Sequence, residues 1–94
     1  PTDNEPQNGL PQFVELHNYP NPFNPETTIV FSVKENETGF LTIYNLKGQR
    51  ILMETFSSGN HQYHWNAEEL SSGVYFYKLQ TPRYYKINKA LLLK

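Results

Sequence analysis

The stretch Asn18-Tyr19-Pro20-Asn21-Pro22-Phe23-Asn24-Pro25 decides how the rest of this chain is interpreted. Its three prolines cannot donate backbone hydrogen bonds, and each pushes the residue before it toward extended dihedral angles. The stretch therefore cannot be a helix and is at most an irregular edge strand. We interpret residues 18–25 as a rigid clasp, in which the rings of Tyr19 and Phe23 pack on the domain. The alternative is a linker in the polyproline conformation.

Two further expectations belong to the clasp. Asn21 or Asn24 should bond to neighbouring backbone in an Asx turn, because short amides readily reach nearby main-chain groups. The clasp should also lead directly into a strand at residues 27–33, where β-branched and aromatic residues alternate with more polar ones. Ile29, Phe31 and Val33 share one face of that strand, which is the pattern of a half-buried antiparallel strand.

The next part of the chain predicts a hairpin. Residues 40–44 and 49–56 are the two strands, and Asn45-Leu46-Lys47-Gly48 lies between them. Asn45 suits the first position of a type I turn, and Gly48 suits the left-handed position of the bulge that follows such a turn.

The remaining strands follow at similar spacing. Residues 61–66 place Trp65 on the inner face, at the expected centre of the core, because tryptophan buries the largest area. After a loop at 67–73, residues 74–79 form a strong strand. Leu70, Gly73 and Tyr75 together resemble a tyrosine corner, in which a tyrosine near the start of a strand bonds back to the preceding loop. Residues 84–93 form the last strand.

About seven short strands at this spacing predict an all-β fold, an antiparallel β-sandwich of the immunoglobulin-like or fibronectin III-like kind. A short first strand is expected at 13–16, and residues 1–12 resemble a linker from an upstream domain, so the sandwich should span 13–94. The residues expected to be buried are Ile29, Phe31, Leu41, Ile43, Trp65, Tyr75 and Tyr77.

Composition excludes several classes of function. There is no cysteine, so neither a disulfide nor a thiolate site is possible. No apolar run approaches the roughly 20 residues of a transmembrane helix. The charge is uneven, since residues 1–70 hold nine acidic and three basic residues whereas residues 71–94 hold five basic residues and no acidic one. A basic C-terminal quarter suggests an anionic partner, and lysines guarding a strand edge are the structural alternative.

No arrangement of side chains indicates catalysis or a cofactor. His61 and His64 would point to opposite faces of one strand, and His17 lies far away in sequence. The adjacent acids Glu68-Glu69 and the serines 71–72 lack the setting of an acid pair or a nucleophile elbow. We therefore expect no enzyme activity and no metal. Phe76 and one of residues 84 and 85 should point outward, as the rings of a carbohydrate-binding module do.

The motifs together resemble the type A C-terminal sorting domain of the type IX secretion system, known from Bacteroidota and related bacteria. The matching segments are NYPNPFNPETTIVFSV (18–33), LTIYNLKGQRI (41–51), GNHQYHWNA (59–67), SGVYFYKL (72–79) and KINKALLLK (86–94). The immunoglobulin-like domain of the flagellar hook-capping protein shares part of the pattern.

The resemblance implies a seven-stranded immunoglobulin-like sandwich at the C-terminus of an exported protein, behind an upstream cargo domain. Such domains are recognised by the outer-membrane translocon after export to the periplasm, and the cargo becomes secreted or attached to the cell surface. A sortase-like peptidase commonly removes the domain and can join the cargo to anionic lipopolysaccharide. Nucleic acid, cofactors and catalysis have no part in this function. The alternative function is a non-catalytic carbohydrate-binding or interaction module of a secreted enzyme.

The last strand is the expected recognition element, with bases on one side, apolar residues on the other and an edge that could pair with a receptor strand. Its recognition residues would be Lys86, Ile87, Lys89, Ala90, Leu91, Leu92, Leu93 and Lys94. The lysines would steer the strand toward an acidic surface. The structural motif residues are Tyr19, Pro20, Asn21, Pro22, Phe23, Asn24, Pro25, Asn45, Gly48, Trp65, Gly73 and Tyr75.

Overall fold

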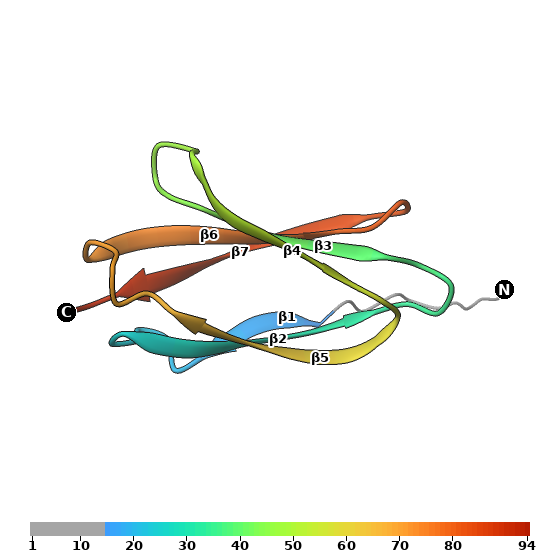
Figure 1. Cartoon of the computed structure of the whole chain (residues 1–94), viewed down its shortest axis with the longest axis horizontal. Coiled ribbons are helices and arrows are strands. Elements are labelled where there is room, and N and C mark those ends of the chain that lie inside the picture. The colour runs from blue at the N-terminus through green and yellow to red at the C-terminus, as the bar shows by residue number, and fades with distance from the viewer. Residues whose placement is uncertain (1–14) are drawn as a thin grey trace, which may run out of the picture.

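Residues 15–94, which the computed structural model describes, form two antiparallel β-sheets packed face to face, with no helix (Figure 1). The strands are β1 (Leu16–Tyr19), β2 (Glu26–Val33), β3 (Gly39–Tyr44), β4 (Arg50–Phe56), β5 (Gly59–Asn66), β6 (Gly73–Gln80) and β7 (Tyr85–Leu92). One sheet has the order β1-β2-β5 and the other has the order β4-β3-β6-β7. The predicted seven-stranded β-sandwich is confirmed.

The connections explain how two sheets arise from one chain. The β3–β4 connection is a hairpin within the four-stranded sheet, whereas Ser57 and Ser58 carry the chain from β4 across to β5 in the other sheet. The chain returns to the four-stranded sheet through residues 67–72 and completes that sheet with β6 and β7 (Figure 1). As a result, β7 is an edge strand that lies near β1, the edge strand of the opposite sheet.

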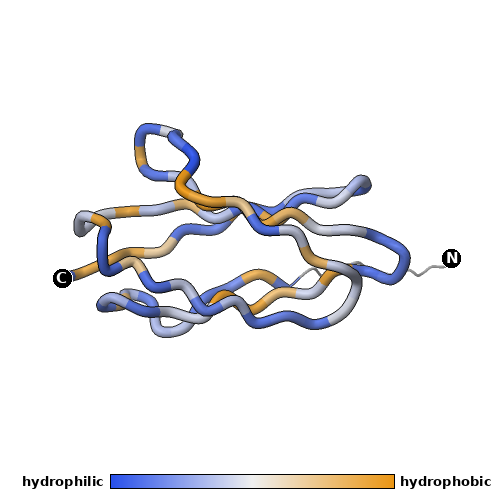
Figure 2. Tube along the Cα trace, viewed as in Figure 1, coloured by the Kyte–Doolittle hydropathy of each residue, from blue (hydrophilic) through white to orange (hydrophobic). Residues whose placement is uncertain are grey.

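The core follows the alternation that the sequence predicts. Hydrophobic and hydrophilic segments alternate along several strands (Figure 2), because side chains point alternately to the two faces of a sheet. All seven residues expected to be buried are buried: Ile29, Phe31, Leu41, Ile43, Trp65, Tyr75 and Tyr77. The inner faces of the two sheets meet on these side chains.

The first strand differs from the prediction. It runs from Leu16 to Tyr19 instead of over residues 13–16, and positions 13 and 14 lie outside the described residues. In the register with β2, Leu16 and Asn18 face inward, so Tyr19 faces outward opposite Thr28. The prediction that Tyr19 packs on the sandwich is therefore wrong, because its ring is 78% exposed.

The two predicted turn motifs are present. In the hairpin, the Gly48 amide donates to the Asn45 carbonyl at 2.9 Å, and Gly48 has a φ of 85°, the left-handed conformation that favours glycine. The strand register shifts between Ile43 and Tyr44, which is the bulge next to this turn. In the corner, the Tyr75 hydroxyl donates to the Ser71 carbonyl at 2.7 Å.

Candidate recognition surface

One ring of the clasp, that of Phe23, packs in the core. Phe23 is 2% exposed, and its ring centroid lies 5.1 Å from that of Trp65. Trp65 in turn makes an edge contact with Tyr75. The prediction that Phe23 packs on the sandwich is confirmed, and burial of such a ring stabilises the clasp by roughly 2–3 kcal/mol.

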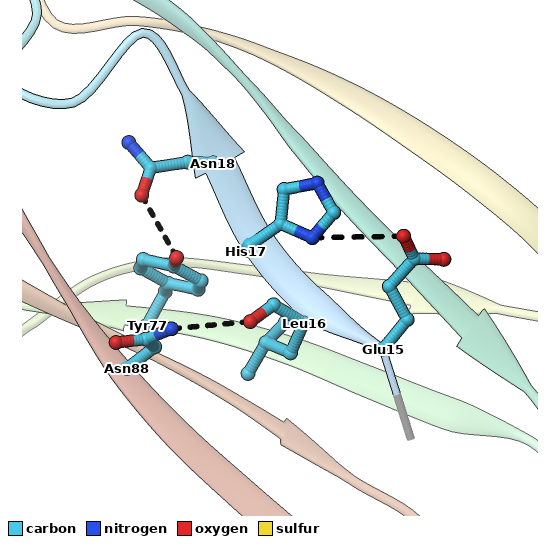
Figure 3. A network of polar contacts seen from close by, with 6 residues as sticks. All are labelled: Glu15, Leu16, His17, Asn18, Tyr77 and Asn88. Atoms are coloured by element: carbon cyan, nitrogen blue, oxygen red, sulfur yellow. Dashed lines mark hydrogen bonds and ion pairs between the residues drawn. The ribbon is translucent and has the colours of Figure 1, made fainter. Parts of the chain in front are cut away.

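A buried polar network holds the start of the clasp. The Tyr77 hydroxyl donates to Oδ1 of Asn18 at 2.8 Å, so β6 of one sheet is joined to β1 of the other (Figure 3). Nδ2 of Asn18 donates to Oγ1 of Thr27 at 3.1 Å, and that hydroxyl donates to the Pro20 carbonyl at 2.8 Å. Burial also raises the pKa of Tyr77 to about 12, so the hydroxyl stays protonated and able to donate even at alkaline pH, where an exposed tyrosine ionises.

A second link joins the two edge strands nearby. Nδ2 of Asn88 on β7 donates to the Leu16 carbonyl of β1 at 3.1 Å (Figure 3). Asn18, Thr27 and Asn88 were not singled out from the sequence. For Asn18 and Thr27 the available signal was a polar side chain at an inward position of a strand, since a buried polar group must find a partner.

The tip of the clasp lies along the outer edge of β7. Asn21 bonds to the strand through both side-chain atoms: Nδ2 donates to the Lys89 carbonyl at 3.1 Å, and Oδ1 accepts from the Leu91 amide at 3.0 Å. The Phe23 amide donates to the Leu91 carbonyl, and the Leu93 amide donates to the Phe23 carbonyl, both at 2.9 Å. The clasp therefore occupies the edge of β7 from Lys89 to Leu93.

This arrangement corrects the prediction of an Asx turn. Asn21 does bond to backbone, but its partners are 68 and 70 positions away in sequence, on β7. The physical reason is that an edge strand leaves every second residue with an outward amide and carbonyl. Leu91 is such a residue, and the Asn21 amide matches its donor and acceptor at once.

The same geometry limits strand pairing at this edge. Because Leu91 directs its backbone groups toward the clasp, the residues two and four positions earlier, Lys89 and Ile87, direct theirs to the same side. The Lys89 carbonyl already accepts a hydrogen bond from Nδ2 of Asn21, so a receptor strand could add beside Tyr85–Ile87 without displacing the clasp. Addition along residues 89–93 would require the clasp to leave.

The side chains of the expected recognition segment divide into buried and exposed groups. Ala90 and Leu92 are 1% and 0% exposed and belong to the core, and Leu91 is half-buried. Ile87 and Leu93 are about half exposed, at 51% and 50%. A partner that binds the folded domain therefore meets Ile87 and Leu93 but not Ala90 or Leu92.

The prediction that the basic residues lie on one side of β7 is wrong. Lys86 and Lys89 are three positions apart, so the alternation of the strand directs them to opposite faces. Lys94 is engaged within the domain, where its Nζ donates to the carbonyls of Glu68 at 2.6 Å and Leu70 at 2.7 Å. The Lys94 ammonium thus stabilises the 67–72 loop.

The other candidates from the sequence are dispersed. His61 packs against the rings of Phe31 and Phe56, and Nε2 of His64 lies 2.8 Å from a Glu26 carboxylate oxygen. Within residues 15–94, no three histidine or carboxylate side chains gather as a metal site. The same residues include no helix with the length and hydropathy needed to cross a bilayer. Of the two tyrosines at 84–85, Tyr85 is the outward one, 65% exposed.

Comparison with known proteins places this geometry in a family. The family model described as a secretion system C-terminal sorting domain matches residues 17–94, which covers the clasp and all the strands after β1. No curated protein and no solved structure shows a significant match. The match favours sorting over the carbohydrate-binding alternative. The chain belongs to the family of secretion system C-terminal sorting domains and is a type IX sorting signal, which directs its protein through the periplasm to the cell surface or beyond.

Proposed function

We propose that the type IX outer-membrane machinery recognises the folded domain through the exposed side of β7 and the residue that follows it. The observation that carries this proposal is the state of the strand: the clasp holds its backbone while the apolar side chains of Ile87 and Leu93 remain half exposed. Exposed aliphatic groups on an ordered strand favour docking, because little conformational entropy remains to be lost.

In this proposal the segment has a division of roles. Ile87, Lys89 and Leu93, which share the outward parity of the strand, contact the machinery, Ala90 and Leu92 anchor the strand in the core, and Leu91 presents its backbone to the clasp. Lys94 holds the C-terminal end in place through the 67–72 loop. The clasp acts as a positioning element, because its bonds to residues 89–93 keep the contact residues in register.

The remaining parts of the function are proposed from the family and the sequence. Residues 13–94 act as the sorting domain, and residues 1–12 connect it to an upstream cargo domain, where a sortase-like peptidase would cut. The domain itself is non-catalytic, needs no cofactor and does not bind nucleic acid. Its role is to be recognised.

The test is a charge reversal with a matched control. The 94-residue chain is fused to the C-terminus of an exported reporter in a bacterium with a type IX system, and the reporter in the medium is compared with that in the periplasm. Lys89→Glu should lower the secreted fraction about fivefold, which corresponds to about 1 kcal/mol of lost attraction. Lys47→Glu changes the charge equally in the distant β3–β4 turn and should have no effect.

Stability must be measured alongside secretion. Lys89 is an exposed side chain, so its substitution should change the free energy of unfolding by only about 0.5 kcal/mol. Normal export of both Lys89→Glu and an Ile87→Asp variant, each with an unchanged melting temperature, would contradict recognition through β7.

A further inference from the structure

The outer face of the four-stranded sheet carries an apolar and cationic grid. The registers place side chains side by side across the strands: Met53, Thr42, Lys78 and Ile87 in one row, and Tyr44, Phe76 and Lys89 in the next. A third row contains Thr55, Phe40, Gln80 and Tyr85. We call these three rows the grid face.

Large apolar side chains of the grid face are open to solvent. Phe40, Met53, Tyr85 and Ile87 are between 39% and 65% exposed. A groove of about 490 Å³ runs among Phe40, Tyr44, Met53 and Lys78. Contiguous apolar surface of this kind on a small domain marks an interaction site more often than isolated exposed residues do.

The outer face of the other sheet provides a contrast within the same molecule. Its outward positions on β2 and β5 are occupied by Thr28, Val30, Ser32, Asn60, Gln62, His64 and Asn66, together with Glu26. Tyr19 and Val30 are its only large apolar side chains on the described strands. The inner faces of both sheets form the shared core, and the two faces compared here are the outer ones. The apolar side chains on the outer face of the four-stranded sheet are therefore not part of the core that drives folding.

The charges on the grid face have one sign. Lys78 and Lys89 lie within the rows, and Arg50 reaches the sulfur of Met53 at 4.0 Å. The only carboxylate on the described strands of this sheet is Glu54, which is opposite Leu41 and therefore directed away from the grid face. Lys78 Nζ lies 5.8 Å from the centroid of the Tyr44 ring, so cation and ring form one surface.

This composition favours a protein partner over a sugar. Aromatic residues, methionine and arginine are enriched at protein–protein interfaces, and aliphatic side chains fill their cores. Met53 and Ile87 add exposed aliphatic surface that cannot form hydrogen bonds with a sugar, whereas such surface packs well in the core of a protein–protein interface. The absence of acids on the described part of this face indicates that the partner surface is acidic.

We infer that the grid face is a second docking surface, which binds an apolar patch with an acidic rim on the type IX outer-membrane machinery. The inference rests on the sorting function and extends its contact from β7 across β6, β3 and β4. Because Ile87 and Lys89 belong both to the grid face and to the proposed recognition strand, one partner surface can engage both without a gap.

The test uses substitutions far from β7. In the reporter fusion, Met53→Glu on β4 should lower the secreted fraction about tenfold, and Lys78→Glu on β6 should lower it about fivefold. Gln62→Glu, on the outer face of the other sheet, is the matched control and should secrete normally. The purified 94-residue chains should keep their melting temperatures, because all three positions point away from the core.

Contact is then measured directly with a photoreactive amino acid at position 53 or at position 62. Irradiation of cells should give an adduct between position 53 and a protein of the type IX outer-membrane machinery, weakened by Lys78→Glu, and no such adduct from position 62. An adduct with lipopolysaccharide, an adduct with a second copy of the chain, or no adduct would each overturn the inference. If Met53→Glu and Lys78→Glu secrete normally while Lys89→Glu does not, only the grid face is refuted. If Lys89→Glu and Ile87→Asp also secrete normally, the proposed function fails as well.

Discussion

Removing the Asn21 side chain tests the link between the clasp and β7. Asn21→Ala deletes the bonds to the Lys89 carbonyl and the Leu91 amide and leaves the hydrophobic anchor Phe23 in place. A hydrogen bond contributes about 0.5–1.5 kcal/mol net, and these two are exposed, so the loss should be about 1–2 kcal/mol. For a domain of this size that corresponds to a fall in melting temperature of roughly 5–15 °C.

Thermal melting followed by circular dichroism gives the total effect, and amide hydrogen exchange locates it. Protection of the Leu91 and Leu93 amides, which face the clasp, should fall about 5–30-fold, while the Ala90 amide on the β6 side should change less. Asn24→Ala, an exposed asparagine in the same clasp, is the control. A melting temperature within 1–2 °C of the unsubstituted chain, a shift small against roughly 4–8 °C per kcal/mol, would refute the reasoning.

Three further predictions concern the core and its polar groups. Trp65→Ala should cost about 3–5 kcal/mol, a large part of the total stability, and bring the chain close to unfolding in a chemical denaturation series. Tyr75→Phe removes only the bond to Ser71 and should cost about 1 kcal/mol in the same assay. The raised pKa of Tyr77, about 12, means that the unfolded chain loses this proton first as pH rises. Stability that is fully present below pH 10 should therefore decline between pH 10 and 12, by up to about 1.4 kcal/mol per pH unit, and Tyr77→Phe should show a shallower decline.

Local patterns in the sequence predicted most of the fold. Apolar and more polar residues alternate regularly along strands such as β2 and β6. This two-residue period was enough to assign Ile29, Phe31, Tyr75 and Tyr77 to the core. The hairpin turn at Asn45 to Gly48 was likewise determined by residues within four positions of one another. Both features depend on short-range geometry, which a single sequence contains.

The features that the sequence did not reveal depend on register or on distant partners. Tyr19 and Phe23 are similar rings in the same motif, yet the register of β1 directs Tyr19 to solvent while the clasp buries Phe23. The partners of Asn21 lie across the domain on β7, and nothing near position 21 identifies them. The sequence did contain the signal that Lys86 and Lys89 point to opposite faces of β7, because residues an odd number of positions apart in a strand lie on opposite faces.

The central claim is that this folded chain is by itself a sufficient address for type IX export. The most direct measurement is the location of an exported reporter that carries the 94-residue chain at its C-terminus, in cells with and without a working type IX channel. We predict that the reporter reaches the cell surface or medium only in cells with the channel, and that deletion of residues 90–94 leaves it in the periplasm. A reporter that stays in the periplasm of channel-containing cells, although its attached chain is folded and resists protease, would contradict the claim.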